Sequence, residues 1–155
     1  MLPEEIRADA FTTFVMATER PLRLALSAAF GPDNGREAAT DALAYGWEHW
    51  DRVKDMENPA GYLYRVGLNL ARRMSSRGTV LLAAVPLDAE TWVEPRLVTV
   101  LTRLPLKQRV AVALVHGYGW SLGETASLLG VSKGTVQGNV DRGLKRLRRD
   151  LGVER

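Results

Sequence analysis

The sequence predicts an all-α protein made of two small helical domains joined by a short linker. Apolar residues recur at helical spacing through most of the 155 residues. No segment alternates between apolar and polar residues within turn-forming flanks, as a half-buried strand would. The hydrophobic share of 46% and the charged share of 25% are typical of a globular chain rather than a disordered one.

The first domain is expected to span residues 1–77 and to begin with two helices. The first covers residues 9–30, where phenylalanine, valine and leucine recur at helical spacing. The sequence Gly31-Pro32-Asp33-Asn34 then breaks the helix, because glycine and proline are the strongest local turn signals. A second helix is expected over residues 35–54.

The third helix of this domain has a clear start signal. Asn58 is a candidate N-cap, and Pro59 fits the first helical position, where a missing N–H removes no hydrogen bond. The helix should continue to about Ser76. Residues 78–94 contain a proline and acidic residues without a clear helical period, so they are expected to form the linker.

The second domain, residues 95–155, is expected to contain three helices. Residues 108–116 belong to the first of them, after Leu104-Pro105, and residues 122–129 form a short second helix. The third, beginning after Ser132, is long and basic.

Capping signals mark the turn between the last two helices. Ser121 and Glu124 have the spacing of a capping box, in which each side chain bonds the other residue's backbone amide. Gly130 fits a left-handed C-cap, and Ser132 is a plausible N-cap for the last helix. A capped short helix, a tight glycine turn and a long basic helix together indicate a helix-turn-helix.

The last helix divides into an apolar face and a basic face at about 100° per residue. The apolar stripe, expected to pack inward, is Val136, Val140, Leu144, Leu147 and Leu151. The opposite face carries Gly134, Gly138, Arg142, Lys145 and Arg149. Exposed helical glycines cost about 1 kcal/mol each relative to alanine, which is understandable if another molecule approaches the backbone closely. We expect DNA to occupy this face; a solvated basic surface is the alternative.

Charge is distributed unevenly along the chain. Residues 1–94 hold 10 lysine and arginine residues against 14 acidic ones, whereas residues 95–155 hold 11 against 4. The basic half is therefore a candidate for contact with nucleic-acid phosphates, although charge alone does not exclude an ordinary solvated surface.

Several classes of protein are not expected. The chain has no cysteine, and its two histidines, His49 and His116, lack metal-ligand spacing, so no metal site is expected. No apolar run is long enough to span a membrane, and the N-terminus does not resemble a signal peptide, so we expect a cytoplasmic protein. No nucleophile–base pair or glycine-rich phosphate loop indicates an enzyme, and no cofactor is expected.

Two sets of residues stand in a recognisable order. The later set is Leu104-Pro105, Gln108-Arg109, Gly119-Trp120-Ser121, Glu124, Ala126, Leu129-Gly130-Val131-Ser132, Gly134-Thr135-Val136 and residues 144–147. The earlier set comprises residues 39–43, residues 58–66, Asn69 and Arg72-Arg73. Together they resemble regions four and two of the extracytoplasmic-function (ECF, group four) RNA polymerase sigma factors, over nearly the whole chain.

The resemblance implies a transcription initiation factor that binds core RNA polymerase, melts the minus-ten region and reads the minus-thirty-five element. An anti-sigma factor is implied as a further partner. Polymerase contacts are implied for Asp41, Leu43 and Trp47. Contacts with minus-ten DNA are implied for Asn58, Tyr62, Arg65, Asn69, Arg72 and Arg73. The helix-turn-helix would contact DNA through Lys133, Gly134, Thr135, Gln137, Gly138, Arg142, Lys145, Arg146 and Arg149.

Structural roles are the alternative for several of these residues. Trp47 and Trp50 are expected in the core, and Tyr62 and Tyr64 could equally be core aromatics. Asp41 could belong to a solvated helix face.

The sequence also departs from the family pattern. Ala44-Tyr45 stand where Gln-Glu is frequent, Tyr62 replaces a common tryptophan, and Gly138 and Gly143 stand where serine and alanine are frequent. The details of polymerase contact and promoter sequence therefore stay open. So do two other functions: a sigma-like helix-turn-helix regulator that does not engage core polymerase, and a helical module that only docks proteins.

Overall fold

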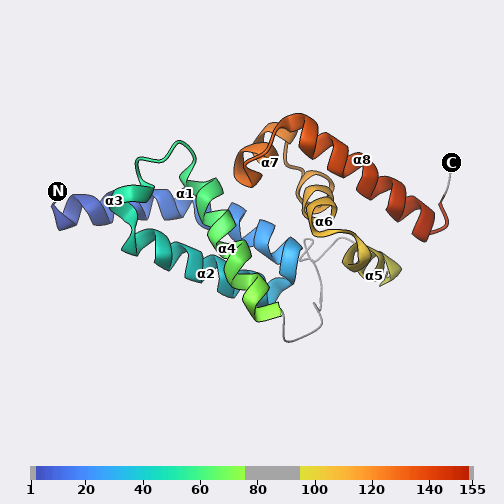
Figure 1. Cartoon of the computed structure of the whole chain (residues 1–155), viewed down its shortest axis with the longest axis horizontal. Helices are drawn as coiled ribbons and strands as arrows, with labels where there is room; N and C mark the ends of the chain where they lie inside the picture. Colours follow the sequence, from blue (N-terminus) through green and yellow to red (C-terminus); the bar gives the residue numbers. More distant parts are fainter. Residues whose placement is uncertain (1–2, 76–94, 154–155) are drawn as a thin grey trace.

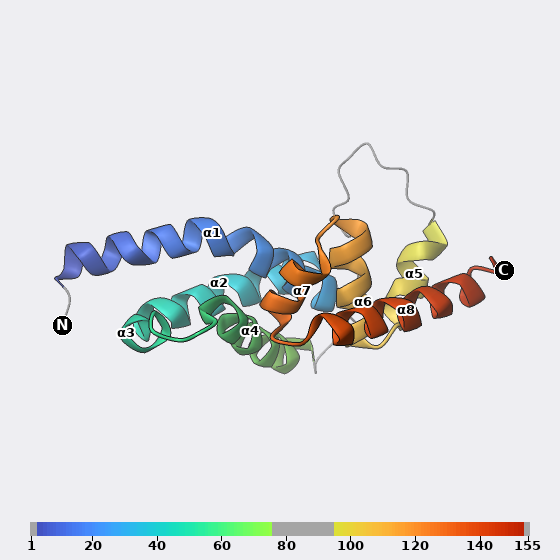
Figure 2. The same ribbon diagram turned by 90° about the horizontal axis from the view of Figure 1, so that it is seen from above.

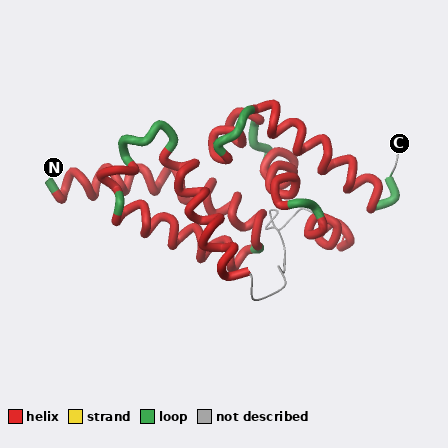
Figure 3. Tube along the Cα trace, viewed as in Figure 1, coloured by secondary structure: helices red, strands yellow, loops and turns green. Residues whose placement is uncertain are grey.

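The computed structural model describes residues 3–75 and 95–153, and it confirms the predicted all-α fold. Every regular element in these two ranges is a helix (Figure 3). The expected linker, residues 78–94, lies outside the described residues. None of the described helices is long and apolar enough to cross a membrane.

Three long helices pack against one another in the N-terminal part (Figure 1). They are α1 (Glu4–Phe30), α2 (Pro32–Glu48) and α4 (Pro59–Ser75), and the short helix α3 (Trp50–Val53) follows α2. Their shared core is filled by residues with no exposed surface, which include Leu22, Ala25, Leu26, Ala38, Ala42 and Leu63.

The predicted starts of the first two helices were wrong. α1 begins at Glu4 rather than Asp9, because Glu4 and Glu5 suit a first turn, where the helix dipole favours negative charge. α2 begins at Pro32 rather than Gly35, since proline is well suited to the first helical position. The break between these helices therefore shrinks to Gly31, whose φ of 91° favours glycine.

The prediction of one continuous helix over residues 35–54 was also wrong. The helix stops at Glu48 and restarts at Trp50, with His49 between them at φ −114° and ψ 23°. Tertiary packing explains the break, because Trp50 is 5% exposed and its ring centroid lies 5.2 Å from those of Phe11 and Phe14. This packing between distant aromatic residues cannot be seen in the local helical pattern of the sequence.

The C-terminal part contains α5 (Pro95–Arg103), α6 (Leu106–Val112), α7 (Leu122–Leu129) and α8 (Lys133–Asp150) (Figure 1). A π-helical turn, Ala113–Gly117, continues α6. The expectation of three helices was wrong because α5 was missed. That helix is short, and it is stabilised by a small apolar cluster shared with the end of α8, consisting of Leu97, Val100, Leu101, Leu104, Val112, Leu144, Leu147 and Leu151.

The apolar stripe of α8 packs inward as predicted. Val136 and Val140 are 0% and 2% exposed. Gly143, a departure from the family pattern, is buried, and an ideal Cβ at this position would lie 2.6 Å from Val112 Cγ2. Glycine here lets α8 approach α6 closely, so the departure has a packing reason.

The N-terminal and C-terminal helices pack on each other (Figure 2). α6 contacts α1, and α7 contacts α4. The main apolar cluster runs across this boundary, because Val110, Leu114 and Leu128 join the core of α1 and α4. We call this boundary the seam.

Arg109 joins the two parts at the seam. Its guanidinium donates hydrogen bonds to the carbonyl oxygens of Ala28, at 3.0 Å, and Ala29, at 2.6 Å. These carbonyls belong to the last turn of α1, where helix carbonyls lack partners within the helix. The same guanidinium donates to the carbonyls of Thr102 and Leu104 beside α6. Burial lowers the pKa of Arg109, but an arginine with only carbonyl partners still supplies positive charge at a helix C-terminus.

Candidate nucleic-acid interface

The predicted caps of the helix-turn-helix are present. Ser121 Oγ accepts a hydrogen bond from the Glu124 amide at 3.0 Å, and Glu124 Oε1 accepts one from the Ser121 amide at 3.2 Å. Gly130 adopts φ 71° and ψ 34°, the left-handed C-cap. Ser132 Oγ accepts from the Thr135 amide and begins α8. The turn between α7 and α8 is therefore fixed by local chemistry, as the sequence predicted.

The N-terminal end of α8 is open to solvent. Lys133, Gly134, Thr135 and Gln137 are all exposed. Gln137 Nε2 donates to Asp141 Oδ1 at 2.8 Å, which holds the amide along the helix surface. These side chains are polar and reachable, as base-reading groups at the start of a recognition helix must be.

The later part of α8 carries exposed cations. Arg142 donates to Asn139 Oδ1 at 3.0 Å, and its guanidinium lies beside the half-buried Gly138. Arg149 lies 3.4 Å from the Asp150 carboxylate, which partly offsets its charge. Lys145 and Arg146 are exposed, and within residues 3–75 and 95–153 no ion pair joins either to a carboxylate. This face is suited to phosphate contact.

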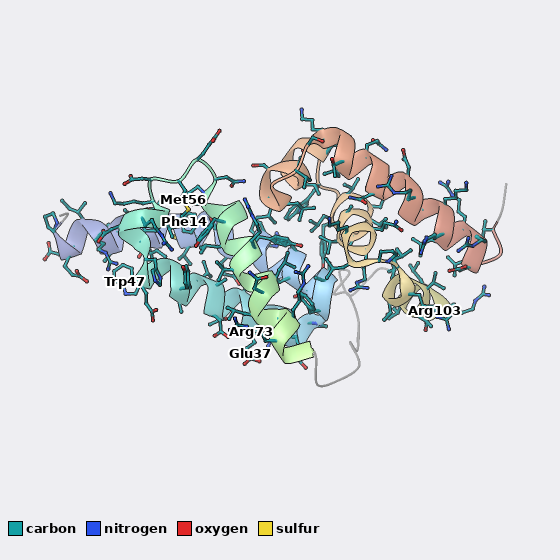
Figure 4. All side chains as sticks on the ribbon, in the orientation of Figure 1. Phe14, Glu37, Trp47, Met56, Arg73 and Arg103 are labelled. Carbon is teal, nitrogen blue, oxygen red and sulfur yellow. The ribbon has the colours of Figure 1, made fainter. Side chains whose placement is uncertain are left out.

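A second set of candidate residues forms one face of α4. Asn58, Tyr62, Arg65, Asn69 and Arg72 follow each other at spacings of 4, 3, 4 and 3 residues, so they lie along a single stripe. Arg73 is the next residue, near the C-terminal end of α4 (Figure 4).

The two tyrosines of α4 have different environments. Tyr64 is 3% exposed and belongs to the core, and burial raises the pKa of its hydroxyl well above the usual range. Tyr62 is half-buried and reaches the surface. Of the two, only Tyr62 is therefore available to a ligand.

The start of this stripe faces the helix-turn-helix across a groove of about 570 Å³. The groove is lined by Met56, Glu57, Asn58, Tyr62, Arg65, Ser127 and Gly130. Across the seam, Asn58 Nδ2 donates to the Ser127 carbonyl at 2.6 Å. The Arg65 guanidinium packs beside Gly130, with Nη2 3.4 Å from an ideal Cβ there. We call this the closed arrangement. In it, α7 and the turn after it contact the amide of Asn58 and the guanidinium of Arg65, so these groups are not available to DNA.

The three candidate polymerase-binding residues do not share a face of α2. Asp41 is exposed, whereas Leu43 is half-buried and packs on the main core. Trp47, labelled in Figure 4, is also half-buried. Its ring centroid lies 5.2 Å from that of Phe11, and the Arg7 guanidinium lies over the ring at 4.2 Å. Of the three, Asp41 is the most accessible to a partner.

A cluster around Tyr45 was not predicted from the sequence. Tyr45 stacks on His49, and its hydroxyl lies 3.3 Å from that of Tyr62. Arg52 donates to both hydroxyls. The aromatic pair at positions i and i+4 was the available signal, but the break at His49, which brings Arg52 back over the tyrosines, could not be read from the local pattern.

Residues 95–147 match the family described as Sigma-70, region 4. Over 129 residues the chain is 34% identical to the RNA polymerase sigma-E factor of Streptomyces coelicolor, which covers 77% of this chain and 73% of the relative. Over 52 residues it is 48% identical to the ECF RNA polymerase sigma factor SigM of Mycobacterium tuberculosis, covering 34% of this chain and 26% of that protein.

Two solved structures share the fold. One is the sigma factor RpoE in complex with the anti-sigma factor NepR from Bartonella quintana, with a TM-score of 0.67 and 23% identity, covering 94% of this chain and 99% of that chain. The other is CnrH in complex with the cytosolic domain of CnrY, with a TM-score of 0.59 and 24% identity, covering 96% of this chain and 91% of that chain.

Proposed function

This chain belongs to the ECF sigma factors of RNA polymerase, and we propose that it acts in the cytoplasm, where it directs core polymerase to promoters through two DNA-contacting surfaces. Sigma factors are initiation factors rather than enzymes, and we assign this chain no catalytic residue and no cofactor. The proposed division is a minus-ten and polymerase domain over residues 1–77, a linker over 78–94, and a minus-thirty-five domain over 95–155.

The proposal for the minus-ten surface rests mainly on the stripe along α4. Asn58, Tyr62, Arg65, Asn69 and Arg72 combine amide groups, an aromatic ring and cations on one helix face. Single-stranded DNA is bound by this combination, because bases stack on aromatic rings while cations follow the phosphates. We assign base contacts to Asn58, Tyr62 and Asn69, and strand phosphates to Arg65, Arg72 and Arg73.

The minus-thirty-five surface is assigned to the exposed side of α8. Residues 133–137 would enter the major groove, where side-chain amides and cations can read base edges. Gly134 and Gly138 would allow close approach of the DNA backbone. The cations Arg142, Lys145, Arg146 and Arg149 would contact phosphates.

Two protein partners complete the proposal. Asp41 is exposed on α2, and we assign it a contact with core polymerase. Leu43 and Trp47, half-buried on another side of the helix, would hold α2 in place for that contact through their packing on the core and on Phe11. An anti-sigma factor is the second proposed partner, because the structurally similar RpoE was crystallised with the anti-sigma factor NepR.

The two DNA surfaces cannot both work in the closed arrangement. Asn58 is hydrogen-bonded to Ser127, and Arg65 packs on the turn of the helix-turn-helix. We therefore propose that the seam opens when the chain binds core polymerase, which frees the α4 stripe for the melted strand. The exposed face of α8 is available to duplex DNA in either arrangement.

Replacing Lys145 with alanine should make the salt dependence of DNA affinity shallower. Each cation that neutralises a phosphate releases condensed counterions. Removing one such cation should therefore reduce the magnitude of the negative slope of log affinity against log salt by roughly 0.9. Arg149→Ala should have a smaller effect, because Asp150 already offsets part of the charge. The measurement is fluorescence anisotropy of the full chain on a minus-thirty-five duplex across a salt series.

Arg36→Ala is the matched control, since Arg36 is also an exposed cation and lies on α2, outside both proposed DNA surfaces. Its slope should equal that of the wild type. Equal slopes for Lys145→Ala, Arg149→Ala and the wild type would contradict the assignment and leave α8 as a packing helix with a solvated basic face.

A further inference from the structure

The cluster around Tyr45 combines a ring stack with a cation. The ring centroids of Tyr45 and His49 lie 4.0 Å apart at an interplanar angle of 21°. Arg52 Nη2 donates to the Tyr45 hydroxyl at 2.8 Å and to the Tyr62 hydroxyl at 3.2 Å. Both tyrosines and His49 are half-buried, so each ring keeps an accessible edge or face.

Within the part of the chain that the structure describes, no carboxylate forms an ion pair with Arg52. Its side chain is exposed, and the hydrogen-bond acceptors of its guanidinium are the neutral phenol oxygens of Tyr45 and Tyr62. The nearest acidic residues in the sequence have other partners, because Asp51 pairs with Arg7 at 3.5 Å and Asp55 with Lys54 at 3.5 Å. Within the described ranges, therefore, this guanidinium can still take an anion.

The cluster adjoins the groove that holds the start of the α4 stripe. Tyr62 belongs to both, since it lines the groove with Asn58 and Arg65 and shares hydrogen bonds with Tyr45 and Arg52. The two hydroxyls lie 3.3 Å apart, within hydrogen-bond distance, and Arg52 donates to both of them. The orientation of Tyr62 therefore depends on residues of α2 and α3.

We propose that Tyr45, His49 and Arg52 form a second nucleotide subsite for the melted strand, next to the one at Tyr62. One unpaired base would extend the Tyr45–His49 stack, and its phosphate would bind the Arg52 guanidinium. Flat rings flanked by a cation bind unstacked bases of any sequence. The inference rests on the proposed minus-ten function. It also gives a role to Tyr45, which departs from the family pattern.

The test uses core polymerase with the full chain on a promoter selected by transcription from a random library. 2-Aminopurine is placed at successive positions of the non-template strand, and its fluorescence reports base stacking. In Tyr45→Leu, quenching should be lost at one position, and the lifetime of the open complex should fall roughly tenfold. Tyr45→Phe keeps the ring, so it should keep the quenching. Arg52→Ala replaces an exposed side chain and should shorten the lifetime of the open complex, whereas the control Arg36→Ala should not.

The outcomes are distinguishable. Unchanged quenching profiles and lifetimes in Tyr45→Leu and Arg52→Ala would overturn the subsite, as would a loss of core-polymerase affinity with an unchanged profile, because the cluster would then be a polymerase contact. Failure of the wild-type chain to support any promoter opening would instead contradict the proposed function itself.

Discussion

The double variant Asn58→Cys/Ser127→Cys should fail to open promoters once oxidised and should regain activity when reduced. Asn58 Nδ2 donates to the Ser127 carbonyl at 2.6 Å, and both residues line the same groove, so the two positions lie close together across the seam. A disulfide there would hold the closed arrangement, in which the start of the α4 stripe is covered. We expect opening, measured by permanganate footprinting with core polymerase, to fall about 100-fold on oxidation, because the competent open form is then scarcely populated.

The reduced protein is its own reference, so any effect of replacing Asn58 is present in both arms. The natural chain has no cysteine, which means that the introduced pair is the only source of a disulfide and can be quantified by thiol titration. Ser127→Cys alone, treated with the same oxidant, should stay active. Equal promoter opening by the oxidised and reduced double variant would show that the seam need not open.

Arg109→Met should lower the free energy of unfolding by about 3 kcal/mol. Arg109 is 8% exposed, and its guanidinium donates hydrogen bonds to four carbonyls, two in α1 and two in the segment before α6. Methionine fills similar volume but donates no hydrogen bond, so those carbonyls would be left to water or unpaired. Arg109→Lys keeps the charge but cannot donate in the same planar fork, and it should be intermediate.

Urea denaturation followed by circular dichroism measures this effect. Lys107→Met is the matched control, because Lys107 is an exposed cation on the same helix. Its free energy of unfolding should stay within about 0.5 kcal/mol of the wild type. If Arg109→Met and Lys107→Met had the same free energy of unfolding, the contacts of Arg109 across the seam would contribute no net stability.

The elements that could be predicted from the sequence are those fixed by local chemistry. The capping box at Ser121, the left-handed Gly130 and the Ser132 cap each depend on residues within one turn of chain. The apolar stripe of α8 likewise follows from helical periodicity alone. These features placed the helix-turn-helix correctly.

The features that were missed depend on contacts between distant residues. The break at His49 allows Trp50 to be buried against α1. No glycine or proline stands at the break itself to signal it in the sequence. α5 is too short to stand out by periodicity, and it is held by the end of α8. Arg109 looks like one more cation of a basic domain until the structure brings α1 beside it.

The candidate site shows the same division. The residues of the α4 stripe were all named from the sequence. Neither their contacts with α7 nor the Tyr45 cluster could be predicted, because both depend on how separate helices are placed relative to one another. Gly143 is similar, since the reason for a glycine there is the side chain of Val112 on α6.

In vitro transcription with purified core polymerase on a random promoter library tests the sigma-factor assignment most directly. The chain should produce transcripts that core polymerase alone does not make, from promoters sharing a minus-ten and a minus-thirty-five element, and Asp41→Arg should weaken that activity together with core binding. The absence of any chain-dependent transcript and of co-purification with core polymerase, while duplex DNA is still bound, would contradict the assignment. The chain would then be a DNA-binding regulator that does not engage polymerase.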